Sequence, residues 1–316
     1  MIVDLPSTTT SLVSKKLIQL REDVGAMALT RVLTLVVPTD EHEVESAVQI
    51  AMQASRQHPC RTIVLGAGNA RGATRLDAQI RVGGDAGASE VVVLRLFGAL
   101  GAHGRSVVTP LLLADSPIVA WWPGEPPSDP ANDPVGAIAR RRITDASRAR
   151  TRPATTLGRL AAAYAPGDSD LAWSRITLWR GILAAALDQA PYESVQKVVV
   201  TGAPDSPSTD LLAGWLSRRL RCPVAVQRSA DRSGLVSVQL DRASGTIELT
   251  RPSDDNAATL TQPGSPVHRL ALPHRSDAEC LADELRRLDP DETYHEALVR
   301  GLPEVTSRRA STRDKE

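Results

Sequence analysis

The segment whose residue types most resemble a catalytic or cofactor motif is glycine-rich, Gly66-Ala-Gly68-Asn-Ala-Arg-Gly72, and follows a strand predicted at residues 62–65. Its spacing is close to a dinucleotide fingerprint, in which glycines let the backbone approach a pyrophosphate at the N-terminus of a helix. Residues 73–82 predict a strand instead of that helix, so no helix dipole would hold the phosphate. We interpret the segment as an ordinary glycine loop. An enzyme that binds a nucleotide or sugar phosphate at Gly66–Gly72 stays an alternative.

Motifs of other reaction classes are absent from the sequence. It has no Gly-Lys-Ser/Thr triplet of a P-loop and no Gly-x-Ser-x-Gly of a nucleophile elbow. His58 and Cys60 are two residues apart, but no second pair completes a metal-ligand set. Cys60, Cys222 and Cys280 are scattered and form no Cys-x-x-Cys pair. A thiol-redox adaptor that works through one of them stays an alternative function, but no sequence motif supports it. We expect no catalytic residue, no cofactor and no metal.

The loop before a helix predicted at residues 207–220 could bind a ligand. Ser206 is a good N-cap, and Pro207 suits the first helical position. A helix N-terminus can also bind an anion such as a sugar phosphate. Capping alone explains these residues, and we prefer that interpretation. Asp168 and Asp170 are also interpreted as helix-capping residues.

All five tryptophans lie between Trp121 and Trp215. Trp121 and Trp122 are consecutive on a predicted strand, so their side chains face opposite sides of the sheet. One of them can fill a core, and the other needs a covering element or a partner. Tryptophan is also enriched among the residues that dominate protein interfaces.

A helix predicted at about residues 171–189 has an unusual outer side. One side carries a regular apolar stripe, which predicts a core face. The opposite sector is small and uncharged, with Ser174, Thr177, Gly181 and Ala184. Since a solvated face normally carries charge, we expect another surface to pack against this sector. Trp173 and Arg180 share one flank, and Arg175 and Arg180 are suited to pairing with carboxylates across domains or between chains.

The hydrophobic pattern predicts two α/β domains. The first, residues 1–166, has a β-α-β order that favours a largely parallel sheet. The second, residues 167–302, is predicted to be mixed, with antiparallel strands at hairpin spacing, and residues 303–316 are predicted to be a disordered tail. The predicted strands are 31–37, 62–65, 76–82, 90–96, 117–122, 143–147, 195–201, 224–227, 235–240, 246–250 and 258–261. The predicted helices are 12–27, 40–57, 103–113, 171–189, 207–220, 276–288 and 293–300.

Composition excludes several classes of function. The 316 residues include 37 basic and 37 acidic side chains, so no net charge draws the chain to nucleic acid or an acidic membrane. No apolar run of about 18 residues could span a bilayer, and the first residues lack a secretory signal. We expect a cytoplasmic protein.

Five segments, in this order, carry a resemblance to a known family. They are Leu76-Asp-Ala-Gln-Ile-Arg81, the run from Leu111 through Asp115 to Trp121-Trp122-Pro-Gly, Arg141-Arg-Ile-Thr-Asp145, the run from Asp168 through Trp173 and Trp179 to Arg180, and Pro207-Ser-Thr-Asp210 through Trp215-Leu216. On these segments the chain resembles the glucose-6-phosphate dehydrogenase assembly protein family, OpcA, over roughly residues 17–300.

The resemblance implies a non-catalytic assembly factor and allosteric activator whose partner is glucose-6-phosphate dehydrogenase. That enzyme makes NADPH at the oxidative entry to the pentose phosphate pathway. The family offers no catalytic residue to carry over. The resemblance implies a redox role for some relatives, but this chain has no Cys-x-x-Cys to support one. Among the residues of the matching segments, we expect the partner to bind Asp115, Trp121, Trp122, Trp173, Arg175 and Arg180.

Overall fold

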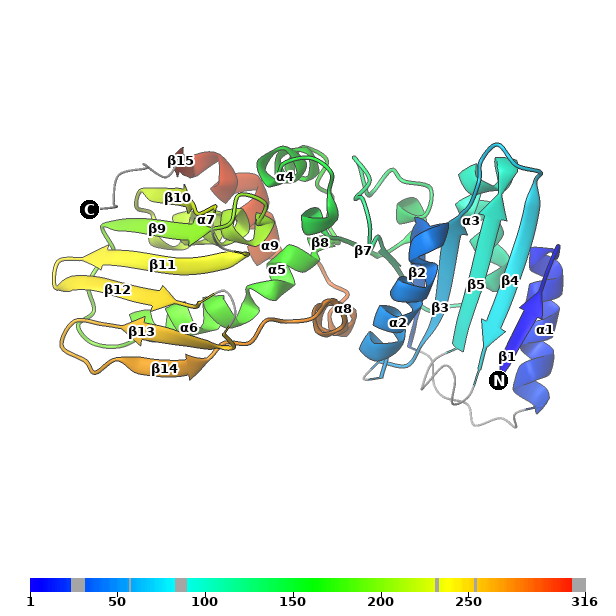
Figure 1. Ribbon diagram of the computed structural model, residues 1–316, viewed down its shortest axis with the longest axis horizontal. Helices are drawn as coiled ribbons and strands as arrows, with labels where there is room; N and C mark the ends of the chain where they lie inside the picture. Colours follow the sequence, from blue (N-terminus) through cyan, green and yellow to red (C-terminus); the bar gives the residue numbers. More distant parts are fainter. Residues whose placement is uncertain (24–31, 57, 83–89, 231–232, 253–254, 309–316) are drawn as a thin grey trace. The chain divides into compact units, whose positions relative to one another are not determined.

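A computed structural model describes residues 1–23, 32–56, 58–82, 90–230, 233–252 and 255–308 (Figure 1). The chain forms two compact units, and each unit combines segments that are distant in sequence. Unit 1 contains residues 1–148, 165–171 and 276–290, and unit 2 contains residues 149–164, 172–275 and the segment from residue 291. The domain boundary after residue 166 stays a prediction, because neither unit is continuous in sequence.

Unit 1 is built on a mixed sheet whose described strands number eight, in the order β1-β4-β5-β3-β2-β6-β7-β8. From β5 to β8 all neighbours are parallel, whereas β4 and β1 add antiparallel strands at one edge. The predicted largely parallel sheet is therefore confirmed. The strands are β1 (Ile2–Leu5), β2 (Leu33–Asp40), β3 (Cys60–Ala67), β4 (Arg75–Arg81), β5 (Glu90–Phe97), β6 (Ile118–Trp121), β7 (Arg141–Thr144) and β8 (Asp168–Asp170).

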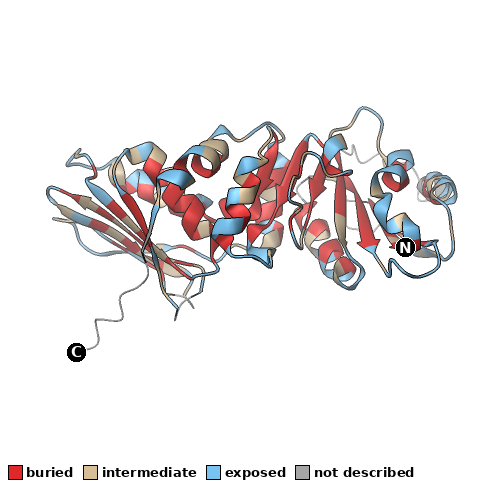
Figure 2. Cartoon of the chain, turned by 90° about the horizontal axis from the view of Figure 1, so that it is seen from above, coloured by how far each residue is buried: buried red, intermediate tan, exposed pale blue. Residues whose placement is uncertain are grey.

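Apolar side chains fill a core on each face of this sheet, which explains why its central strands are buried over most of their length (Figure 2). On one face lie α2 (Val44–Ala54) and α8 (Asp277–Arg286). On the other lie α1 (Thr10–Asp23) and α3 (Gly104–Val108). In α2 the buried positions recur at helical spacing, so the helix presents one apolar side to the strands.

Unit 2 has a second mixed sheet, with seven described strands in the order β14-β13-β12-β11-β9-β10-β15. The strands β9, β10 and β15 are parallel, and the others pair antiparallel, as the sequence predicted for the second half. The strands are β9 (Lys197–Gly202), β10 (Val224–Arg228), β11 (Leu235–Arg242), β12 (Gly245–Thr250), β13 (Ala257–Thr261), β14 (His268–Ala271) and β15 (Thr306–Arg308). Its helices are α4 (Pro153–Ala162), α5 (Leu171–Arg175), α6 (Thr177–Leu187), α7 (Pro207–Leu220) and α9 (Glu292–His295), with a π-helical turn over Glu296–Gly301. Every helix in the described part of the chain is too short or too polar to span a bilayer.

The helix predicted at residues 171–189 is broken at Ile176. Its backbone has φ −95° and ψ 7°, and separates α5 from α6. The Thr177 hydroxyl donates to the Ser174 carbonyl at 2.8 Å, a side-chain bond of the kind that competes with the regular helical pattern.

Two further predictions were wrong. Asp168 does not cap a helix but begins β8, where it pairs with Arg142, whereas Asp170 ends β8 directly before α5 and accepts from the Thr144 hydroxyl at 2.6 Å. Burial raises the pKa of Asp168 despite the nearby guanidinium. The predicted disordered tail begins too early, because Thr306–Arg308 form β15 beside β10; residues 309–316 lie outside the described residues.

A buried ion pair attaches α8 to the sheet of unit 1. On β7, Arg141 donates from Nε and Nη2 to Oε2 of Glu284, at 3.0 and 2.5 Å, and from Nη1 to the Asp289 carbonyl at 2.8 Å. The side chains of Arg141 and Glu284 are only 4% and 6% exposed. The two positions are 143 residues apart in the sequence, so this contact fixes a late segment onto an early core.

Replacing Glu284 with alanine should destabilise the protein by about 3–5 kcal/mol, because it leaves the Arg141 guanidinium buried without its counter-ion. The double variant Arg141→Met with Glu284→Met should recover most of that loss, since an apolar pair carries no desolvation penalty. Urea denaturation followed by circular dichroism measures both changes.

The control is Asp289→Ala, which removes the neighbouring but exposed ion pair with Arg140. An exposed pair contributes about 1 kcal/mol or less. If this variant loses as much stability as Glu284→Ala, burial is not what makes the Arg141 contact important.

Candidate partner interface

The strand order of unit 1 identifies where a nucleotide would bind if this sheet held one. The order β5-β3-β2-β6-β7-β8 is that of a doubly wound dinucleotide-binding sheet, and it reverses between β2 and β6. Ligands of such sheets bind at the carboxyl ends of the strands beside this switch point. Here the end of β2 and the turn after it read Pro38-Thr-Asp40-Glu41-His-Glu43 in place of a glycine-rich turn.

A cavity of about 230 Å³ lies at this switch point, and its charge does not suit a phosphate. Asp40, Glu43 and Glu125 line it, together with Trp122 and Gly124. A shallow hollow at the ends of β2 and β3 adds Glu41 to the acidic side chains. Several carboxylates around one cavity repel an anion, so the residues present do not fit the phosphates of a dinucleotide.

The glycine loop after β3 is explained by packing. A Cβ atom on Gly66 would lie 2.5 Å from Cγ2 of Val44, and one on Gly68 would lie 2.5 Å from Cε1 of Phe97. The segment that follows forms the strand β4, as predicted, and not the helix that a pyrophosphate site requires. Glycine is favoured at positions 66 and 68 because neighbouring side chains approach the backbone there.

Trp121 and Trp122 face opposite sides of the sheet, and each fills a core of unit 1. Trp121 is 1% exposed in the core formed with α2 and α8, and Trp122 is 6% exposed in the core on the other face. The partner contact expected for these two indoles is therefore corrected to a packing role. Sequence alone could not decide this, because the covering segments come from distant parts of the chain.

Trp173 is also buried, at 1% exposure, and it organises unit 2. Its Nε1 donates to Oδ2 of Asp291 at 2.8 Å, and its ring lies 5.9 Å from that of Tyr294. The other oxygen of Asp291 accepts from the backbone N–H groups of Thr293 and Tyr294 and so caps α9. Trp173 is therefore a structural residue, and the partner role expected for it is corrected as well.

Arg180 and Trp173 share one flank, as predicted, with the guanidinium 3.7 Å above the indole ring. Arg180 and Arg175 are half-buried residues of unit 2, and Arg175 lines a cavity near the start of α7. Asp115 is exposed in unit 1, in a turn before β6 with a φ of 57°. For these three residues a partner contact stays a prediction.

The outer side of α6 is exposed and uncharged. We call the set Thr177, Leu178, Gly181, Ala184 and Ala185 the α6 face; all five are exposed, and Leu178 is 40% exposed. A Cβ atom on Gly181 would meet no heavy atom within 4 Å. Ser174, which the sequence placed in this sector, is instead buried because it precedes the break at Ile176. An uncharged helix face left open to solvent is a place where another protein surface can pack.

The three cysteines are free thiols in the described structure. Cys60 and Cys280 are fully buried in the core of unit 1. Cys222, in unit 2, is half-buried, and burial raises the pKa of its thiol. A raised pKa lowers the thiolate fraction at neutral pH and with it the reactivity of the sulfur.

Two family models match the chain and together span more than half of it. Residues 51–162 match the N-terminal domain, and residues 166–298 the C-terminal domain, of the glucose-6-phosphate dehydrogenase subunit. No curated protein sequence matches the chain. Among solved structures, an aldose-aldose oxidoreductase from Caulobacter crescentus, complexed with glycerol, aligns over 85% of this chain and 95% of its own with 10% identity and a TM-score of 0.41.

Truncating Trp122 to alanine should cost about 3–5 kcal/mol of unfolding free energy, because it opens a cavity in a core. Leu178→Ala, on the exposed α6 face, should change stability by about 0.5 kcal/mol or less. Thermal unfolding of the two variants compares them directly. A Trp122→Ala protein as stable as the unmodified chain would contradict the packing role assigned to this indole.

Proposed function

The chain belongs to the glucose-6-phosphate dehydrogenase subunit family, OpcA, and on this premise we propose that it is a non-catalytic assembly factor and activator of a glucose-6-phosphate dehydrogenase. The two family matches carry the proposal. In this role the chain supports NADPH production at the oxidative entry to the pentose phosphate pathway, in the cytoplasm.

The residues of unit 1 support a non-catalytic role. The sheet has the strand order of a dinucleotide-binding domain, but Asp40, Glu43 and Glu125 occupy its switch point. An NADP phosphate would meet carboxylates there instead of a glycine-rich turn at a helix N-terminus. The alternative of an enzyme that uses the Gly66–Gly72 loop is disfavoured on the same grounds.

Activation requires a difference in affinity between two states of the dehydrogenase. A protein that binds the active conformation or oligomer better than the inactive one shifts the population toward it. Each tenfold shift requires about 1.4 kcal/mol of differential binding free energy. An activator of this kind needs a docking surface and no catalytic group of its own.

The surface that we assign to this docking is the α6 face. Small side chains let a partner approach the helix closely, and Leu178 supplies an apolar contact. Arg180 is half-buried on the adjacent flank and held against Trp173, and we propose it as a charged contact at the edge of the face. Asp115 and Arg175 stay as predicted contacts outside this face.

Gly181→Arg should abolish binding and activation while leaving the fold intact. The new side chain has free space in the isolated chain, and replacing a helical glycine raises helix propensity by up to about 1 kcal/mol. Docked against a partner, the same side chain would force the surfaces apart. Co-purification with the host dehydrogenase and an activity assay with increasing amounts of chain measure the effect.

Gly158→Arg is the matched control. Gly158 is an exposed glycine of α4, and a Cβ atom there also meets nothing within 4 Å. It should bind and activate as the unmodified chain does. Equal activation by both variants rejects the α6 face, and failure of the unmodified chain to bind or activate the dehydrogenase rejects the proposed function.

A thiol-redox adaptor would behave differently. Because Cys222 is the thiol that is not fully buried, Cys222→Ser should activate the dehydrogenase as well as the unmodified chain, with or without oxidant. Loss of activation in this variant, with unchanged circular dichroism, would favour the redox adaptor instead.

A further inference from the structure

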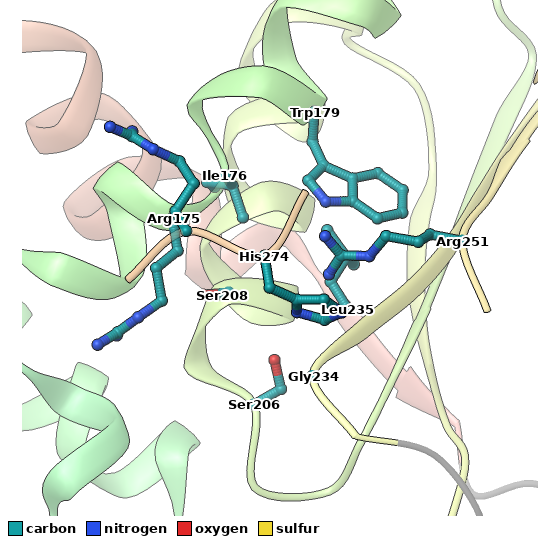
Figure 3. A pocket seen from close by; sticks show the side chains of 10 residues that line it. Arg175, Ile176, Trp179, Ser206, Ser208, Gly234, Leu235, Arg251 and His274 are labelled. Carbon is teal, nitrogen blue, oxygen red and sulfur yellow. The ribbon is translucent and has the colours of Figure 1, made fainter. Parts of the chain in front are cut away.

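A cavity of about 100 Å³ lies inside unit 2, where α7 begins (Figure 3). Its lining comes from α5 and α6, from the start of α7, from the ends of β11 and β12, and from the segment after β14. Among the ten described residues that line it, none is acidic. Three are arginines, Arg175, Arg251 and Arg275, and two are serines, Ser206 and Ser208.

The first turn of α7 is open to an acceptor. Ser206 is the N-cap, but its side chain makes no capping bond to the helix. Its hydroxyl accepts from the Thr209 hydroxyl at 3.0 Å and points into the cavity, where its own proton can be donated (Figure 3). Pro207 has no N–H, so the first backbone N–H group that the helix can offer to a ligand is that of Ser208, at the second helical position. The capping predicted for Ser206 is therefore not made by its side chain.

Arg251 is the second and independent feature. It follows β12, is only 6% exposed, and extends toward His274 and Leu235 beneath Trp179 (Figure 3). Its Nη1 donates to the carbonyls of Leu272 and Pro273, at 3.1 and 3.4 Å. Its Nε is buried without any hydrogen-bond partner, and no carboxylate pairs with it within the described residues.

A buried guanidinium without a counter-ion is costly unless something compensates its charge. Burial lowers the pKa of Arg251, which reflects the same unmet charge. Elsewhere in unit 2, the buried Asp210 does have a guanidinium partner, Arg228, at 2.5 Å. What distinguishes Arg251 from the other buried guanidinium groups of unit 2 is its place in the cavity at the start of α7, where an anion from outside the chain can reach it.

We propose that this cavity binds a phosphate group. The donors are the Arg251 guanidinium and, at the start of α7, the Ser206 hydroxyl and the helix N-terminus, which together suit an oxyanion. The volume is close to that of about three liquid waters, enough for one phosphate but not for a nucleotide. The group is either inorganic phosphate or the phosphate of a small monoester whose remainder extends through the opening. The site does not depend on the function proposed above.

The test is calorimetric titration and thermal unfolding of the full chain with three probes, inorganic phosphate, glucose 6-phosphate and glucose. Ionic strength is held constant with sodium chloride. Phosphate and glucose 6-phosphate should bind and raise the unfolding midpoint as their concentration rises, and glucose should not. Tighter binding of glucose 6-phosphate identifies a monoester site, and equal binding identifies a site for inorganic phosphate.

Arg251→Met should weaken phosphate binding at least tenfold and remove the rise in midpoint. Arg242→Met is the matched control: Arg242 is also 6% exposed in unit 2, also donates to a backbone carbonyl, and does not line the cavity. Its phosphate affinity should stay within twofold of the unmodified chain.

Ser206→Asp provides a second variant that keeps the fold, because aspartate is itself a good N-cap. Its carboxylate should repel phosphate from the cavity and abolish binding. If Arg251→Met fails to fold, Ser206→Asp decides the question. The proposal is overturned if the unmodified chain binds neither anion, or if the folded variants bind phosphate as tightly as it does.

Discussion

A guanidinium group that leaves water must meet acceptors inside the protein, and this requirement determines much of how the chain is assembled. On β7, Arg141 binds Glu284 and the Asp289 carbonyl, and Arg142 binds Asp168 and three backbone carbonyls. These bonds attach the edge strand β8, and α8 from late in the sequence, to the sheet of unit 1. Arg251 in unit 2 hydrogen-bonds only to carbonyls within the described chain and lies over the Trp179 ring, and it has no carboxylate partner there beside the cavity at α7.

Unit 1 has the topology of a nucleotide-binding sheet, but the charges at its switch point do not suit a nucleotide. Unit 1 keeps the strand order and the switch point, but Asp40, Glu43 and Glu125 surround the place where phosphates bind. Arginine side chains and a helix N-terminus instead surround a smaller cavity of unit 2. A chain of this kind can share an architecture with dinucleotide-dependent enzymes while acting through its surface, as the family membership leads us to propose.

Local patterns predicted most of the fold. Buried β-branched runs identified β2, β3 and β5, and the Ser206–Pro207 signal placed the start of α7 where it occurs. The misses have physical reasons: β1, β8, β14 and β15 are short edge strands whose pairing depends on distant segments, and the break at Ile176 depends on a local side-chain bond. The six expected partner residues were chosen by type, and burial then assigned Trp121, Trp122 and Trp173 to cores. The Arg251 cavity could not be predicted, because its lining residues are far apart in sequence.

Hydrogen–deuterium exchange of the chain with and without its glucose-6-phosphate dehydrogenase tests the central claim most directly. Complex formation should slow exchange at the backbone amides of residues 177–187, because a docked surface would cover the α6 face and prevent the helix from fraying. Exchange at the backbone amides of α4, a helix of the same unit that also has one exposed side, should be unchanged. Protection confined to other segments, with α6 unaffected, would contradict the assigned interface, and no protection anywhere in the chain would contradict the partnership itself.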